Sequence, residues 1–366
     1  MRKSKSYIGV HLTHDSSVCQ VTNGKIDWFA EEERFSRVKH DSFPSLALLN
    51  MDINSFDNKL QISGLYEPHN KDKFKNDAKS FCTQAVKKYT SEIAAGLVHK
   101  EVIQYEFYLQ HHDFHAACGF YNSGFPRAAV LVVDGMGNPL EDKDNMQEVE
   151  SIYSCGYPTI FKRHATNVTP TYIEADKMRL CFGIGMVYQS LSNYFGFGDF
   201  GSGKLMGLAS YGEEDPNIKS FLHDDGTTVT DLFYRSRFGL KFIPYDYVKY
   251  PNNTDEFIDI DSKDIKQRFA NLAYRVQKDF EKYMTTLILK TLDVTGEKNL
   301  VLTGGCALNC VANYEYLKHL PEGVKLYVEP ISTDAGTSIG LAKIDYYSAT
   351  KSTSRHPLKT LYLGKE

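Results

Sequence analysis

The amino-acid sequence predicts a two-lobed protein of the α/β class. Residues 7–12 form an apolar, β-rich run that ends in Thr13-His14-Asp15-Ser16-Ser17, and residues 128–133 form a second such run that ends in Asp134-Gly135. Two units of strand and polar turn indicate two related lobes, although no residue-by-residue repeat is visible. Apolar residues step by three and four from 265 to 288, which predicts a long amphipathic core helix. A chain of 366 residues is also too long for one simple core.

The composition is that of an ordinary soluble protein. Hydrophobic residues make up 42% and charged residues 24%, and the formal net charge of −4 provides no general attraction to nucleic acid. The seven cysteines form no CxxC pair, which favours a reducing compartment. No apolar run is long enough to span a membrane, so we expect a cytoplasmic protein without a membrane partner.

The first lobe is predicted to open with three consecutive antiparallel strands. Residues 18–22 and 25–31 are strand-like, and Asn23-Gly24 between them is a strong hairpin signal. Residues 44–100 have a mainly helical pattern and indicate little about function.

A histidine-rich stretch, Gln110-His111-His112-Asp113-Phe114-His115, contains the first candidate site. His111 and His115 are four residues apart, which places both imidazoles on one face of a helix. Two neutral imidazoles in this arrangement form half of a divalent-metal site. Asp334, in the turn before the last predicted helix, is the candidate third ligand, whereas solvated surface histidines are the alternative.

Two glycine-containing segments are candidate nucleotide contacts. A helix is predicted over 183–195, and the glycine-rich loop 196–204 follows it. Backbone amides in such a loop can cradle a phosphate, and Lys204 can add positive charge. A flexible connection between two elements is an equal alternative for this loop. Residues 299–302 are a predicted strand, and Thr303-Gly304-Gly305-Cys306 then opens a helix, where glycines let a flat ring or a phosphate approach the backbone. A last strand over 324–328 precedes a final helix that runs through Tyr347.

Seven motifs in this order resemble the O-carbamoyltransferases of the nodulation and aminoglycoside type. Together they extend over nearly the whole chain, which makes the resemblance specific. They are His14-Asp15-Ser16-Ser17; the run from Glu31 to Arg37 with Lys39-His40-Asp41; His111 to Ala117; Val133-Asp134-Gly135; Gly203 to Ala209; Thr303 to Asn309; and Thr333-Asp334-Ala335-Gly336.

The resemblance implies a fold and a division into lobes. The N-terminal half of these proteins is similar to threonylcarbamoyl-adenosine synthase, which has the actin-like ATPase fold, two ribonuclease-H-like lobes around a nucleotide and metal cleft. We therefore expect an N-terminal lobe over 1–125, with a final helix over 333–350 packing back on it, and a C-terminal lobe over 126–332. Residues 351–366 are expected to be a tail or linker.

The resemblance also implies site residues. It implies that His111, His115 and Asp334 bind iron, with zinc as the alternative, and that nucleotide contacts come from Lys204, Gly304, Gly305 and Asn309. It implies that His14 and Lys39 face the carbamoyl and phosphate chemistry. An imidazole accepts a hydroxyl proton at neutral pH, and His14 is the first candidate for this general base, with His112 second. Lys39 is expected to stabilise the phosphate of the leaving AMP.

The predicted reaction is carbamoyl transfer from carbamoyl-adenylate, made from carbamoyl phosphate and ATP, to an acceptor hydroxyl. The acceptor is expected to be a small molecule or a hydroxymethylated nucleotide. Family members continue into a YrdC-like domain that makes the adenylate, so a YrdC-like domain or subunit is the expected partner, and a homodimer is a further expectation. Threonylcarbamoyl transfer to tRNA is an alternative that the composition and the motifs disfavour. A third interpretation is a non-catalytic nucleotide-binding scaffold, which the presence of all three predicted metal ligands disfavours.

Overall fold

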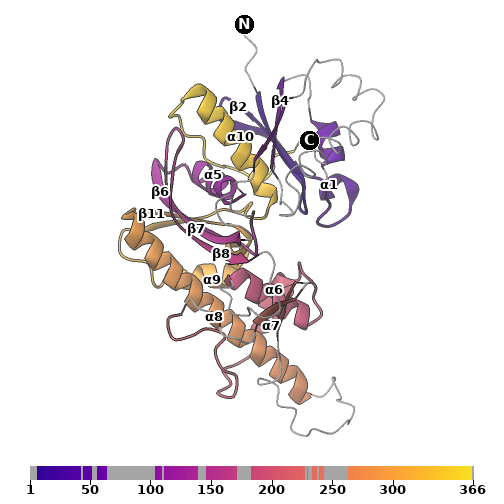
Figure 1. Cartoon of the computed structure of the whole chain (residues 1–366), viewed down its shortest axis with the longest axis vertical. Helices are drawn as coiled ribbons and strands as arrows, with labels where there is room; N and C mark the ends of the chain where they lie inside the picture. Colours follow the sequence, from indigo (N-terminus) through magenta and orange to yellow (C-terminus); the bar gives the residue numbers. More distant parts are fainter. Residues whose placement is uncertain are drawn as a thin grey trace.

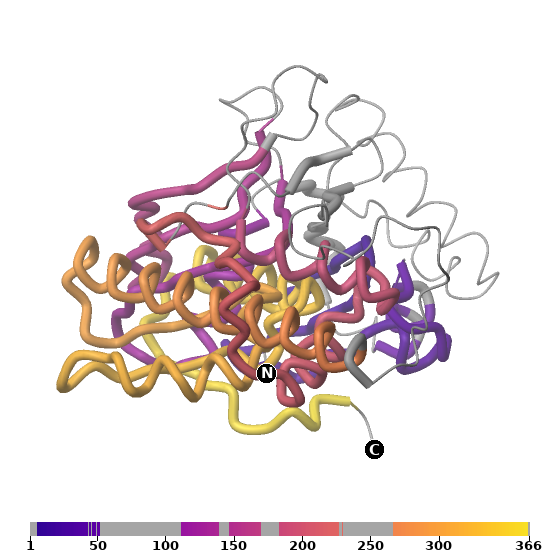
Figure 2. The backbone as a smooth tube through the Cα atoms, turned by 90° about the horizontal axis from the view of Figure 1, so that it is seen from below, coloured from indigo at the N-terminus to yellow at the C-terminus, as the bar shows by residue number. Residues whose placement is uncertain are grey.

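The computed structural model describes residues 6–42, 44–51, 56–63, 104–108, 111–138, 146–170, 183–226, 229, 233–236, 239–242 and 263–364. Two five-stranded sheets, one in each lobe, form its framework, and Figures 1 and 2 show the course of the chain from two directions. None of the helices in these ranges is both long and apolar enough to cross a membrane.

The first sheet has the strand order β3-β2-β1-β4-β5. Its strands are β1 (Ser6–His11), β2 (Ser17–Thr22), β3 (Lys25–Glu31), β4 (Phe56–Ser63) and β5 (Gln104–Tyr108). The three predicted antiparallel strands are confirmed, and Asn23 and Gly24 at the hairpin turn have φ angles of 52° and 80°, as a tight two-residue turn requires. The helical prediction for 44–100 is wrong at β4, because this segment pairs in parallel with β1.

The second sheet repeats this topology. Its strands are β6 (Arg127–Val133), β7 (Met146–Gly156), β8 (Ile160–Pro170), β11 (Asn299–Thr303) and β12 (Lys325–Val328), in the order β12-β11-β6-β7-β8. Three antiparallel strands, β6 to β8, are extended beyond β6 by two parallel strands, as β1 to β3 are extended beyond β1 in the first sheet. The two lobes are therefore related in topology.

Helices α5 (His111–Ser123) and α10 (Ala335–Thr350) form the layer between the two sheets (Figure 1). They cross closely at Gly340, where an added Cβ would lie 2.0 Å from the carbonyl oxygen of Phe114. Gly9 allows a similarly close approach of β1 to α10, since its Cβ would lie 2.0 Å from the Ser338 oxygen. Glycine at these crossings brings the first turns of α5 and α10 together.

The long helix α8 (Lys263–Thr295) packs on the other side of the second sheet, where its apolar stripe enters the core with residues such as Val276 and Met284. Helices α6 (Ile184–Tyr194) and α7 (Ser202–Ala209) pack beside it. The predicted loop over 196–204 is therefore corrected: it ends at Gly201, and the next three residues form the first turn of α7.

Shorter elements complete the described chain. They are α1 (Glu33–Ser36), α2 (Ser45–Asn50), a hairpin of β9 (Phe233–Ser236) and β10 (Gly239–Phe242), the 3-10 turn η3 (Gly305–Leu308) and α9 (Cys310–Tyr316). Residues 351–364 form no helix or strand, but they lie against the first lobe, where the Leu358 amide donates to the Asn122 carbonyl and the Phe29 amide donates to that of Leu363.

Candidate functional site

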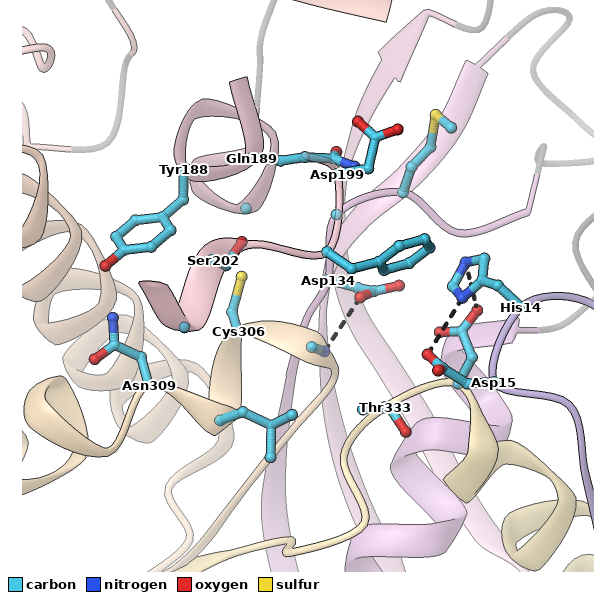
Figure 3. Close-up of a pocket in the computed structure, with 18 of the residues that line it drawn as sticks. His14, Asp15, Asp134, Tyr188, Gln189, Asp199, Ser202, Cys306, Asn309 and Thr333 are labelled. Carbon is cyan, nitrogen blue, oxygen red and sulfur yellow. Dashed lines mark hydrogen bonds and ion pairs between the residues drawn. The ribbon is translucent and has the colours of Figure 1, made fainter. Parts of the chain in front are cut away.

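A cavity of about 440 Å³ lies between the lobes, at the carboxyl ends of β1, β6 and β11 (Figure 3). Asp15 follows β1, Asp134 follows β6 and Gly305 follows β11. The turn after β12 adds Thr333 and Asp334. The equivalent strand ends of two related sheets thus bring polar groups from distant parts of the chain to one place.

Four buried side chains form a metal-type cluster beside this cavity. The Nε2 atoms of His111 and His115 lie 3.1 Å apart, and Asp334 Oδ1 lies 3.4 and 3.5 Å from them. Asp134 Oδ2 lies 3.3 Å from His111 Nε2. The ligand atoms of all four residues lie within 4.8 Å of one another.

These separations fit one shared cation. At a metal–ligand distance of about 2.1 Å, neighbouring ligand atoms lie about 3.0 to 3.4 Å apart in octahedral or tetrahedral sites. Two imidazoles and two carboxylates suit Fe²⁺ or Zn²⁺. The three ligands predicted from the sequence are brought together at the first turns of α5 and α10. Asp134 is a fourth donor that the sequence argument did not assign, although its position at a strand end was the available signal.

The charges of this cluster depend strongly on one another. Burial lowers the pKa of His111, but the carboxylates of Asp334 and Asp134 outweigh it and raise that pKa to about 10. Burial raises the pKa of Asp134, but the hydrogen bond with His111 brings it down to about 2. The cluster therefore holds two carboxylates that need a positive charge close to them.

His14 lies between two carboxylates. Its Nδ1 is 3.3 Å from Asp15 Oδ2, and its Nε2 is 3.4 Å from Asp334 Oδ2. Burial lowers its pKa, but these two partners outweigh burial and raise it to about 8. His14 lines the cavity and both of its ring nitrogens face carboxylates, and its part as the general base stays a prediction.

The cavity mouth contains two residues that the sequence argument did not assign. His40 lies against Phe200, with ring centroids 4.0 Å apart and planes inclined by 16°. Its Nδ1 is 2.6 Å from Asp15 Oδ1. His40 belongs to the same motif as Lys39, the neighbouring residue that the resemblance indicates. Lys39 is exposed and does not line the cavity.

Other lining residues extend the cavity away from the metal-type cluster. The Gly305 amide donates to Asp134 Oδ1 at 3.1 Å, and Gly305 and Asn309 line the cavity with Tyr188 and Phe280. Asn309 begins α9, where its side chain accepts from the Ala312 amide at 3.1 Å, and it donates to Gln277 at 2.9 Å. Figure 3 shows Asn309 and Tyr188 on the side away from His14.

Three further predicted residues lie outside the cavity lining. Lys204 is exposed on the first turn of α7. Gly304 is buried, with a φ of 89°, and its close packing on Val133 shapes the turn that presents Gly305. His112 is fully buried and points towards β7, with its Nδ1 2.8 Å from Ser151 Oγ, so it cannot act as a general base in the cavity.

Known structures and sequences identify the fold and then the family. Full-length HypF, in a phosphate- and nucleotide-bound form, matches 96% of this chain and 57% of its own length, with a TM-score of 0.51 and 12% identity. Together with the repeated sheet topology, this confirms the predicted actin-like fold. The sequence model described as Carbamoyltransferase N-terminus matches residues 66–343, and the chain belongs to that family.

Two relatives illustrate how much of the family's length is present. An uncharacterized protein of Synechocystis is 27% identical, over 90% of this chain and 55% of the relative. Nodulation protein NolNO of Sinorhizobium fredii is 23% identical, over 96% of this chain and 49% of the relative. The chain thus spans about half the length of these curated relatives, and the match confirms the family resemblance noted in the sequence.

Proposed function

We propose that this chain transfers a carbamoyl group from carbamoyl-adenylate to an acceptor hydroxyl, using a bound iron or zinc ion. The observation that carries the proposal is that one cavity of about 440 Å³ is lined both by the carboxylates of a metal-type cluster and by Gly305, Asn309 and Tyr188. Membership of the carbamoyltransferase family supports the identity of the transferred group.

Each group of residues has a proposed part in this reaction. His111, His115 and Asp334 would hold the metal, with Asp134 completing the donor set. When bound, the ion supplies Lewis-acid polarisation and offsets negative charge during transfer. His14 lines the cavity between Asp15 and Asp334, where a ring N–H can donate to the carbamoyl oxygen or the phosphate, whereas Lys39 is exposed and does not line the cavity.

The nucleotide is proposed to occupy the end of the cavity furthest from His14. Gly305 has no side chain to obstruct a phosphate or sugar, and Phe280 and Tyr188 provide apolar and aromatic surface for a base. HypF, similar in fold, is known in a nucleotide-bound form, which supports this assignment. We further propose that carbamoyl-adenylate is made from ATP and carbamoyl phosphate and that a YrdC-like domain or subunit supplies it. The proposed acceptor is a small molecule or a hydroxymethylated nucleotide.

The test supplies purified, metal-loaded protein with carbamoyl-adenylate and a panel of alcohols, from methanol to amino sugars and hydroxymethylated nucleosides. Mass spectrometry should detect the gain of one carbamoyl group on an acceptor, together with released AMP. If the protein releases no AMP and carbamoylates no member of the panel, the proposed function is wrong.

Nucleotide binding provides a second measurement. ADP at about 100 times its dissociation constant should stabilise the protein by about 2.7 kcal/mol. Gly305→Val should abolish this, since Gly305 lines the cavity and a branched side chain there would obstruct the approach of the nucleotide to the backbone. Gly207→Val is the matched control, because no atom lies within 4 Å of a Cβ at Gly207 and it does not line the cavity. A full ADP shift in folded Gly305→Val would contradict the assignment.

A further inference from the structure

The imidazole of His40 is held in place from three directions. Its Nδ1 lies 2.6 Å from Asp15 Oδ1, its backbone amide donates to Glu33 Oε2 at 3.0 Å, and its ring stacks on Phe200. The side chain is nevertheless 35% exposed. A ring that is fixed in orientation but accessible to solvent is typical of a group that meets an incoming molecule.

The contact with Asp15 determines which nitrogen can react. A carboxylate accepts a hydrogen bond from Nδ1–H, so the lone pair of the neutral ring is on Nε2. Among the described residues, no protein group forms a hydrogen bond with this Nε2. The same pairing of carboxylate, oriented imidazole and available Nε2 lets histidine act as a base towards hydroxyl groups in hydrolases. His14 lacks this property, because both of its nitrogens face carboxylates.

The position of His40 also suits an acceptor. His40 and Asp15 line the cavity that reaches Asp334 of the metal-type cluster. Phe200 comes from the second lobe, in the loop before α7, so the stacked rings join the two lobes at the mouth of the cavity. An alcohol entering beside this stack would have its hydroxyl near His40 while the nucleotide occupies the other end.

We propose that His40 is the general base that removes the proton from the acceptor hydroxyl, with Asp15 and Phe200 as the residues that position it. This inference rests on the proposed carbamoyl transfer. The acceptor oxygen forms a bond to the carbamoyl carbon as its proton moves to His40 Nε2. The bond between that carbon and the phosphate oxygen breaks, and its electron pair leaves with AMP. His40 then releases the proton to solvent.

Two substitutions separate this role from a structural one. His40 has a φ of 55°, a left-handed conformation that asparagine and glycine adopt readily. His40→Asn retains an N–H close to the position of Nδ1, so it can still donate to Asp15, but it has no Nε2. His40→Gly removes the ring and leaves space that added imidazole can fill. His319→Asn, at an exposed histidine after α9, is the matched control.

The assay uses metal-loaded protein, carbamoyl-adenylate, and methanol as the hydroxyl probe, with methyl carbamate and AMP as products. His40→Asn should lower the rate of methyl carbamate formation by about 10²- to 10⁴-fold, while ADP still protects it thermally and His319→Asn matches the wild type. Imidazole should restore activity to His40→Gly in proportion to its unprotonated fraction.

The outcomes distinguish the two proposals. Wild-type rates in His40→Asn would overturn the role of His40 and leave carbamoyl transfer intact. A loss in both variants that imidazole does not restore would make His40 a structural residue and also overturn the proposal. A wild-type protein that releases no AMP and forms no carbamate would overturn the proposed function itself.

Discussion

Replacing Asp134 by asparagine tests whether the fourth member of the cluster contributes to metal binding. The substitution removes one negative charge 3.3 Å from His111 Nε2 and keeps an oxygen that can accept from the Gly305 amide. His111 is neutral when it binds a metal, so the charge that this carboxylate faces is that of the ion; at an effective dielectric constant of about 20, a unit charge pair about 4 Å apart interacts by about 4 kcal/mol. Desolvation of the buried carboxylate offsets much of this, because Asp134 is only 8% exposed.

We therefore expect Asp134→Asn to weaken metal binding by about 10- to 100-fold, the usual effect of losing a supporting carboxylate. This corresponds to about 1.4 to 2.7 kcal/mol. His111→Ala, His115→Ala and Asp334→Ala should weaken binding further, since each removes its donor atom altogether, whereas Asp134→Asn keeps a neutral amide oxygen at the site. Asp199→Asn is the matched control, because Asp199 lines the same cavity but belongs to the exposed loop before α7.

Equilibrium dialysis of metal-free protein against increasing Zn²⁺, followed by elemental analysis, measures these affinities without interference from oxidation. An unchanged affinity in Asp134→Asn would mean that Asp134 only supports the Gly305 turn. Unchanged metal content in the histidine and Asp334 variants as well would refute the assignment of the whole cluster.

Two further predictions concern stability. Burial raises the pKa of Glu329 to about 7 from an ordinary value of 4.5. Between these values Glu329 binds more protons in the folded than in the unfolded state, so its contribution to stability falls as pH rises through this range. Glu329→Gln should remove up to about 1.4 kcal/mol per pH unit of that slope; urea unfolding from pH 4 to pH 8 measures it, and parallel curves for the two proteins would contradict the argument. Gly340→Ala should destabilise the fold by about 1–3 kcal/mol or more, because its Cβ would lie 2.0 Å from the Phe114 carbonyl oxygen. Gly207→Ala in α7 is the control: no atom lies within 4 Å of a Cβ there, so this variant should be neutral or stabilising by up to about 1 kcal/mol. Equal unfolding midpoints for these two alanine variants would show that α5 and α10 adjust freely at their crossing.

Local patterns in the sequence determined much of the architecture. The Asn23-Gly24 turn predicted the first hairpin because glycine and asparagine adopt positive φ angles with little strain. The spacing of apolar residues predicted α8 because a helix places every third or fourth side chain on one face. The four-residue spacing of His111 and His115 likewise placed two imidazoles together on α5. Each of these signals depends only on residues close together in the chain.

The tertiary structure decided what depends on distant segments meeting. The strand β4 has no clear local signal and is defined by its pairing with β1. Asp134 joins the metal-type cluster only because β6 ends where α5 and α10 begin. The contacts with Asp15 and Phe200 orient the His40 side chain at the cavity, whereas the neighbouring Lys39 does not line it. Sequence motifs identified the segments that form the site, whereas the close packing of α5, α10 and the two sheets determined which side chain of each segment faces the cavity.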